Sequence, residues 1–211
     1  ISPSHIGFLD PIHTPEGSKT GVTSHLPLGV TKDGNSPTIP VYNMKTGKME
    51  RIDPITFHKS RVVMPDQVRW GKSGPVPVAS TVSMSLAGNK LEPGDIKSAD
   101  YVMRSPSQLF SLTSNLIPFL GNNSGNRASY ATHHIEQAIS LQDRDAPLVQ
   151  VGTGRKDGIR TFEEFVGRQS AHLSPAAGTV TEVKPDGITI RGSDGKTRTV
   201  ALYNNFPLND P

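Results

Sequence analysis

The sequence contains no cysteine, few aromatic residues and no long apolar run. Without cysteine it can form neither a disulfide framework nor a thiolate zinc site, which mildly favours an intracellular setting. No apolar run reaches the roughly 18 residues that a membrane-spanning helix needs. No basic segment followed by an apolar one stands near residue 1, so we expect a soluble protein with no export signal and no membrane partner.

Aromatic residues make up only 6% of the chain and hydrophobic residues 34%, whereas there are 20 glycines and 18 prolines. This composition disfavours a compact all-helical protein and predicts many turns and short strands. We therefore predict an α+β fold of mostly irregular β structure with a central helical pair. The net charge of +3 permits a polyanionic partner without requiring one, because lysine and arginine are spread almost evenly over both halves.

The first half of the chain divides into a loop region and a β-rich region. Residues 1–28 contain Pro3, Pro11, Pro15 and Pro27, which exclude a long regular helix there. In residues 29–104, β-like runs at 38–42, 61–64 and 80–84 alternate with turn signals, so we expect a small β-rich surface domain. The turn signals are Asp33-Gly34, Thr46-Gly47 and Pro93-Gly94.

The second half begins with a helical pattern and returns to β structure. In residues 105–145 the apolar positions 109, 112, 116, 117 and 120 recur at helical spacing, and Ser105 or Ser107 beside Pro106 suits a helix start. A second helix should cover residues 126–140. In residues 146–211 we expect a short helix at 161–168 and strands at 178–183, 187–191 and 197–202, with a turn at Ser193-Asp194-Gly195.

Two segments stand out as candidates for a functional site. The first is Pro3-Ser4-His5-x-Gly7, continued by Asp10-Pro11-x-His13-Thr14-Pro15-Glu16-Gly17. Proline at the second and glycine at the fourth position predict a tight turn over 14–17 that holds Glu16 at a rigid tip. Glu16 is as consistent with a solvent-facing turn residue as with a functional one.

The second segment runs from Asn115 through Leu-Ile-Pro-Phe-Leu to Gly121-Asn122-Asn123-Ser124-Gly125-Asn126-Arg127. An apolar helix end is followed by a loop rich in glycine and asparagine and then by an arginine at a helix start. Free backbone N–H groups and a guanidinium would point the same way there, which suits a phosphate group. Taken alone, Arg127 would more simply be an ordinary arginine in a salt bridge, and Leu116–Leu120 would be core.

In this order and at similar separation, the two segments resemble motifs of the second-largest, β-type subunit of multisubunit DNA-dependent RNA polymerases. Those motifs are close to His-Pro-Ser-His-x-Gly-Arg-x-Cys-Pro-x-Glu-Thr-Pro-Glu-Gly and Leu-Ile-Pro-Phe-Leu-Glu-His-Asp-Asp-Ala-Asn-Arg-Ala. Shorter stretches at 100–102, 146–149 and 152–154 also resemble that subunit. At 211 residues the chain is too short for a whole subunit of this kind, and it begins with Ile1 and not with methionine. We therefore expect an internal fragment or a split piece of one.

The resemblance implies a role in template-directed RNA synthesis as part of an assembly. Arg127 matches an arginine that reaches the triphosphate of the incoming NTP, with Asn126, Asn123 and Ser124 as supporting residues. Glu16 and Gly17, with Pro15 and Lys19, match an active-centre loop that positions the nucleotide and the nucleic acid. Residues 1–28 are then the active-centre loop region, and residues 146–211 are the start of a region that binds the RNA–DNA hybrid.

The resemblance also implies partners and a cofactor. These are a β′-type subunit, the rest of the β-type subunit, DNA template, RNA product and NTPs. The catalytic Mg²⁺ would be held by the partner subunit, so this chain would carry no catalytic residue and would be inactive alone. The expected location is the cytoplasm, associated with the nucleoid, or a virion.

Several positions depart from the family pattern. Phe8 replaces a basic residue, His13 replaces an acid, and Lys19 stands where asparagine is usual. The acidic loop becomes Gly121-Asn122-Asn123-Ser124, and a basic residue late in the second helix becomes Glu136. These departures favour a divergent polymerase encoded by a phage or another virus over an ordinary cellular one.

Other interpretations of the sequence are weaker than the polymerase resemblance. Adjacent His133 and His134 cannot face one ion from a helix, and His5, His13 and His25 lack supporting carboxylates, so we expect no metal site. No catalytic motif of a hydrolase and no nucleophile–base pair is evident, which makes an independent hydrolase a poor interpretation. The main alternative is a catalytically inactive, polymerase-like module that binds nucleic acid or acts as a scaffold.

Overall fold

The computed structural model describes residues 5–86, 90–139, 143, 145–154, 158–170, 173, 174 and 176–202. The chain divides into two compact units, Ile1–Val151 and Gly152–Pro211. The predicted α+β class is confirmed, because short helices accompany irregular sheets in both units. None of the helices in the described residues is long and apolar enough to cross a membrane.

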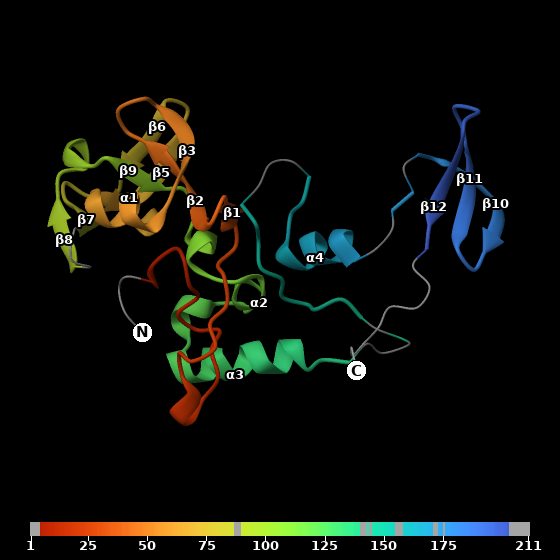
Figure 1. The fold of residues 1–211 in the computed structure, drawn as a ribbon, viewed down its shortest axis with the longest axis horizontal. Helices are drawn as coiled ribbons and strands as arrows, with labels where there is room; N and C mark the ends of the chain where they lie inside the picture. Colours follow the sequence, from red (N-terminus) through yellow and green to blue (C-terminus); the bar gives the residue numbers. More distant parts are fainter. Residues whose placement is uncertain are drawn as a thin grey trace. The chain divides into compact units, whose positions relative to one another are not determined.

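The first unit contains a seven-stranded sheet with the order β1-β2-β9-β4-β7-β8, in which β3 also pairs with β2 (Figure 1). All its pairs are antiparallel except β4 with β9, which is parallel. The predicted strands at 38–42, 61–64 and 80–84 correspond to β2, β4 and β7. The strands are β1 (Thr31–Asp33), β2 (Ser36–Asn43), β3 (Lys48–Ile52), β4 (Val62–Val63), β7 (Val82–Leu86), β8 (Lys90–Gly94) and β9 (Tyr101–Met103).

One of the two core clusters of this unit lies where the sheet packs against the helix α1 (Pro54–Lys59). Asp53 caps α1 by accepting hydrogen bonds from the backbone N–H groups of Ile55 and Thr56. Phe57 points into the core, where its ring meets that of Phe8 edge-on with centroids 5.6 Å apart. The segment before β1, residues 5–30, is here called the N-terminal loop. Through Phe8 it contributes a side chain to the same core as the sheet.

The expectation of a turn at Pro93-Gly94 is wrong, because both residues belong to β8. This strand pairs only with β7, so it is an edge of the sheet, and an edge strand tolerates proline because its missing N–H need not face a neighbour. The turn at Asp33-Gly34 is confirmed between β1 and β2, where Gly34 has φ 57°. A separate two-stranded sheet pairs β5 (Val68–Gly71) with β6 (Gly74–Pro77).

The predicted helix over the leucine pattern of residues 105–120 is broken into three short pieces, of which the last is the 3-10 helix Leu120–Asn122. Ser105 begins a 3-10 helix, Pro106–Leu109, with a capping box, and Ser111 begins the one-turn helix α2 (Leu112–Asn115). The chain cannot continue as one helix, because Ser111 takes an extended conformation as an N-cap and Phe119 has the left-handed φ of 54°. The second helix, α3 (Gly125–Glu136), starts as predicted but ends earlier; residues 140–142 lie outside the described residues.

The second unit follows the predicted elements. It contains α4 (Phe162–Ser170) and an antiparallel sheet of β10 (Gly178–Lys184), β11 (Gly187–Gly192) and β12 (Thr197–Ala201). The turn at Ser193-Asp194-Gly195 is confirmed: Gly195 has φ 77°, and Asp194 accepts a hydrogen bond from the backbone N–H of Lys196. All residues of β10 are exposed.

Phe57→Ala should destabilise the first unit by about 3–5 kcal/mol, because the ring is only 1% exposed and its loss leaves a cavity between α1 and the sheet. Urea unfolding followed by circular dichroism measures this change. Ile55→Ala on the same helix is the matched control, since Ile55 is 66% exposed and its loss should cost no more than about 0.5 kcal/mol. Equal effects of the two substitutions would contradict the assigned core.

Candidate functional site

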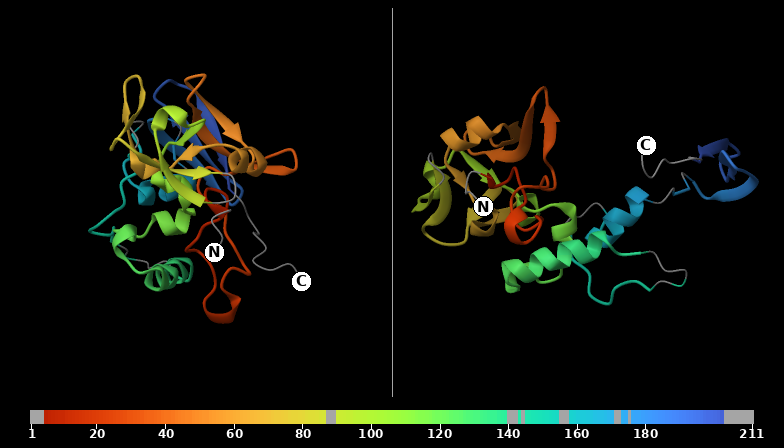
Figure 2. Two further views of the ribbon diagram at one scale, coloured as in Figure 1. Left: turned by 90° about the vertical axis from the view of Figure 1, so that its left-hand side faces the viewer. Right: turned by 60° about the horizontal axis from the view of Figure 1, so that its bottom comes forward.

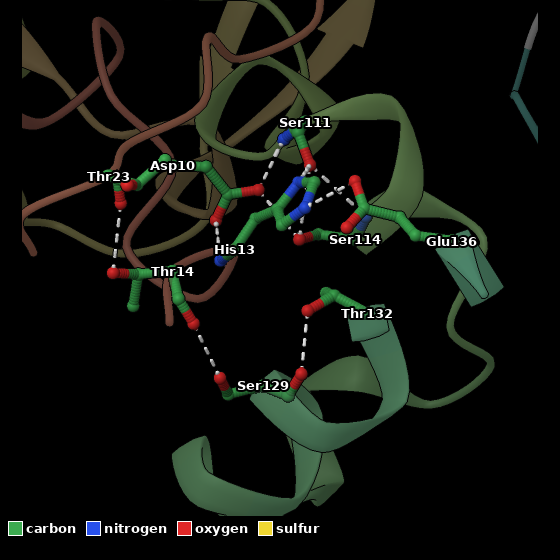
Figure 3. A network of polar contacts seen from close by, with 9 residues as sticks. All are labelled: Asp10, His13, Thr14, Thr23, Ser111, Ser114, Ser129, Thr132 and Glu136. Carbon is green, nitrogen blue, oxygen red and sulfur yellow. Dashed lines mark hydrogen bonds and ion pairs between the residues drawn. The ribbon is translucent and has the colours of Figure 1, made fainter. Parts of the chain in front are cut away.

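The N-terminal loop lies beside α3, and buried polar groups attach it to α2 and α3 (Figures 1 and 2). Asp10 is the first of these groups. Its Oδ1 accepts from the backbone N–H groups of Ile12 (2.7 Å) and His13 (3.1 Å). Its Oδ2 accepts from the N–H of Ser111 and the hydroxyl of Ser114, both at 2.6 Å (Figure 3). The carboxylate thus joins the loop to the start of α2.

Burial raises the pKa of Asp10, but the hydrogen bonds from Ser114, Ile12 and Ser111 outweigh it and leave the pKa below its usual value of 3.8. The group is therefore a buried carboxylate that stays ionised and is held by donors from two distant segments. Its stabilising effect is present above pH 3.8 and is lost as the pH falls through the lowered pKa.

Thr14 forms the next group of hydrogen bonds, both within the loop and to α3. Its hydroxyl donates to the carbonyl of Thr23 (3.1 Å) and accepts from the N–H of Gly21 (2.6 Å), while its carbonyl accepts from the hydroxyl of Ser129 on α3 (3.0 Å). The tight turn predicted over 14–17 is wrong, because Glu16 is extended (φ −87°, ψ 166°). The chain turns one step later, where Gly17 with φ 67° starts a 3-10 helix, Gly17–Lys19.

One face of α3 carries the partners of this loop. Ser129 contacts Thr14, Nδ1 of His133 lies 3.4 Å from Glu16, and Glu136 contacts His13. The three helix positions are four and three residues apart, so they follow one another along one face. Tyr130, in the same helix, is also hydrogen-bonded to Glu16, which raises the pKa of the tyrosine. We call Ser129, His133 and Glu136 the polar face of α3.

A pocket of about 390 Å³ lies between the loop and the N-terminal end of α3. Pro15, Glu16 and Gly17 from the first motif line it together with Asn126 from the second, so the structure brings the two motifs together. Arg127, Asn123, Ser124 and Lys19 are outside its lining. The full lining is Pro11, Ile12, Thr14, Pro15, Glu16, Gly17, Thr20, Gly125, Asn126, Ser129 and Tyr130.

The remaining predicted residues surround the start of α3. Arg127 is exposed in the first helical turn. Ser124 is the N-cap but makes no side-chain capping bond, so its hydroxyl leaves the first N–H groups of α3 without a cap. Asn123 uses its amide locally, donating to the carbonyl of Phe119 (2.9 Å). Lys19 is exposed at the end of the 3-10 helix.

Sequence reasoning missed a row of polar side chains formed by buried Ser111, buried His13 and exposed Glu136 (Figure 3). Ser111 Oγ lies 2.9 Å from Nδ1 of His13, and Nε2 of His13 lies 2.8 Å from a carboxylate oxygen of Glu136. The row has the composition of a hydrolase triad, but Ser111 and His13 are both buried and neither lines the pocket. The hydroxyl also accepts the capping bond from Ser114, so the arrangement supports the fold and does not present a nucleophile to a substrate.

His13 and His25 were predicted to lack a supporting carboxylate. This prediction is wrong, because α3 brings Glu136 close to both. One ligand atom from each of these three residues lies within 4.8 Å of the others. The two rings, however, are stacked in parallel with centroids 3.4 Å apart. Imidazole binds a metal in the plane of its ring, so parallel rings at this separation do not direct their lone pairs to one ion unless His25 turns.

The surroundings of His13 oppose its protonation. Burial lowers its pKa below the usual 6.5 and the stacked His25 lowers it further, against the opposite effects of Glu136 and Asp10. In the tautomer with the proton on Nε2, that proton faces Glu136, and Nδ1 accepts from the Ser111 hydroxyl, which then donates to His13 in place of Ser114 Oγ. The Glu136 oxygen is within contact distance but off the axis of a regular hydrogen bond, so their attraction is chiefly electrostatic.

Comparison with known proteins identifies the class of the chain. Residues 1–30 match the family model for RNA polymerase Rpb2, domain 3. Over 224 aligned residues, which include 99% of the chain, it is 30% identical to the DNA-directed RNA polymerase subunit beta of Corynebacterium glutamicum strain R. The corresponding subunit of Prochlorococcus marinus strain MIT 9312 is 32% identical over 206 residues and 92% of the chain.

Nearly the whole chain is therefore similar to part of the second-largest subunits of multisubunit RNA polymerases. More specifically, it is similar to a segment of the bacterial β subunit. It spans 18% of the length of each of these two relatives and 15% of the β subunit of Mycoplasmoides gallisepticum, to which it is 30% identical over 97% of the chain.

The lowered pKa of His13 predicts a loss of stability in mild acid. Between its folded pKa and 6.5 the unfolded chain binds more protons at this residue, so its stabilising effect is full above pH 6.5 and falls as the pH drops through that window. Urea unfolding from about pH 8 to about pH 5 should show a shallower pH slope for His13→Gln than for the wild type. His58→Gln on α1 controls for the loss of one histidine, and an unchanged slope in His13→Gln would refute the assignment.

Proposed function

We propose that this chain is part of the β-type subunit of a DNA-dependent RNA polymerase, where it helps to position the incoming NTP and the nucleic acid. The observation that carries the proposal is the meeting of both motifs at one pocket: Pro15, Glu16 and Gly17 line it from the loop, and Asn126 lines it from the start of α3. The similarity to β subunits over nearly the whole chain supports the same role.

The chemistry at the start of α3 suits an anion. The uncapped N–H groups carry the positive end of the helix dipole, and Arg127 adds a guanidinium in the same turn. A planar guanidinium can donate two parallel hydrogen bonds to phosphate oxygens. We assign to Arg127 the contact with the triphosphate, and to Asn126, with Ser124 and Asn123 behind it, the support of that corner.

The loop has a different task, because its pocket lining contains Glu16 and no lysine or arginine. Pro15, Glu16 and Gly17 would position the nucleotide or template sterically and by hydrogen bonding, and exposed Lys19 would lie close to a nucleic-acid backbone. Residues 146–211 would be the start of the region that binds the RNA–DNA hybrid. The chain would act through positioning and charge neutralisation and would not supply a reacting group.

The two catalytic Mg²⁺ ions would be held by a β′-type partner subunit. Mg²⁺ prefers oxygen ligands in octahedral geometry, whereas the group of three possible ligands among the described residues contains two histidines. These residues therefore do not suit Mg²⁺. We further propose a divergent, virus-encoded polymerase acting on DNA in the host cytoplasm, since the active-centre motifs depart from the cellular pattern at several positions.

The proposal is tested by affinity purification of the chain from its natural source. Co-purifying subunits are identified by mass spectrometry, and the assembly is assayed for ribonucleotide incorporation on a primed DNA–RNA scaffold. Recovery of a large partner together with Mg²⁺-dependent extension supports a working polymerase. A clean assembly that binds the scaffold without extending it would favour the inactive binding module.

Arg127→Ala in the assembled polymerase should raise the KM for NTP by on the order of tenfold or more, because a charged hydrogen-bond donor to the triphosphate is lost. Arg127→Lys should restore only part of the affinity, since an ammonium keeps the charge but not the two parallel donors. Arg69→Ala, which removes another exposed arginine far along the chain, is the control. An Arg127→Ala enzyme with unchanged NTP dependence would rule out the assigned contact.

A further inference from the structure

We infer that Glu136, at the far end of α3, is a positioning residue for nucleotide addition: through its contact with His13 it holds the active-centre loop against the helix. This inference rests on the proposed function. His13 directly precedes the Thr14–Gly17 segment that lines the pocket, so the position of its side chain sets where that segment begins. Glu136 itself does not line the pocket.

The geometry fixes His13 from both sides. Its Nδ1 is 2.9 Å from Ser111 Oγ, and Ser111 is in turn held by Asp10 and Ser114. Its Nε2 is 2.8 Å from Glu136, and its ring face is covered by His25. His13 is 3% exposed, whereas the side chain of Glu136 is 42% exposed. His13 is therefore held firmly within the loop, whereas Glu136 contacts it from the helix with a side chain that is partly exposed to solvent.

Glu136 is an unfavourable residue for its place in α3 when the helix is considered alone. It is the last helical residue, where the negative end of the helix dipole disfavours a carboxylate, and His133 and His134 are the residues of the last turn that suit it. A carboxylate at this position is explained by a specific partner, and His13 is that partner. The unfavourable interaction of the Glu136 carboxylate with the helix dipole is offset by its contact with His13 in the loop.

The effect on the pocket follows from the polar face of α3. Glu136 lies ten residues beyond Asn126, which is about 15 Å along the helix. Between them Ser129 holds the carbonyl of Thr14, and His133 contacts Glu16. Loss of the end contact frees the residue before Thr14, so the loop should sample positions in which Pro15 and Glu16 no longer face Asn126. Nucleotide affinity should fall more than the intrinsic rate.

The test uses the assembled polymerase and four variants on the primed scaffold, with KM for NTP and kcat measured separately. Glu136→Ala should raise KM about threefold to tenfold with a smaller change in kcat. His13→Glu, which places two carboxylates together, should be worse. The double variant His13→Glu, Glu136→Arg should return KM to within about twofold of the wild type, because an attractive contact between the two positions is restored. Glu182→Ala removes a carboxylate that pairs with Lys184 in β10 and serves as the control.

A double variant no better than His13→Glu, or a Glu136→Ala enzyme with unchanged KM, would overturn the inference. So would a Glu136→Ala enzyme that only yields less assembled complex, since that is a purely structural effect. Hydrogen exchange provides a readout that does not need polymerase activity. Amides of residues 14–21 should exchange faster in Glu136→Ala and regain protection in the charge-reversed double variant. An assembly without RNA synthesis but with this exchange pattern would refute the proposed function and leave the loop contact standing.

Discussion

The arrangement of the site depends on one buried charge, the carboxylate of Asp10. An ionised group that is 4% exposed requires several donors, and its four come from residues 12 and 13 on one side and from residues 111 and 114 on the other. Satisfying this carboxylate therefore fixes the N-terminal loop to the start of α2. His13 and Thr14 lie three and four residues after Asp10, so the same attachment helps to place the residues that contact α3.

After Asp10, the loop is joined to α3 by Ser129, His133 and Glu136, which are four and three residues apart along the helix. Such a face is unusual for the inner side of a helix, where apolar residues normally pack. Polar contacts specify one alignment, because each donor must meet its acceptor, whereas an apolar face tolerates sliding. A loop that must present Pro15, Glu16 and Gly17 at a defined place beside Asn126 benefits from this kind of attachment more than from a larger apolar contact.

The sequence predicted the class of the fold, most strands and the starts of both functional segments, since these depend on local patterns such as the alternation in β2 and the glycine turns. It failed where distant residues decide. The leucine pattern of residues 109–120 looks helical, yet Ser111 becomes an N-cap because Asp10 and His13 engage it. Pro93 with Gly94 predicts a turn unless it is known that β8 is an edge strand, where proline is tolerated. The pairing of His13 with Glu136 was equally hidden, although Ser129, His133 and Glu136 at helical spacing were a signal of a polar face.

The corner formed by residues 121–127 carries no acidic side chain. Arg127 lies there at an exposed helix start for which the described residues show no ion pair. Without a carboxylate in this corner, the local potential is more positive and the guanidinium is available to an anion. The composition of the corner is therefore compatible with phosphate binding.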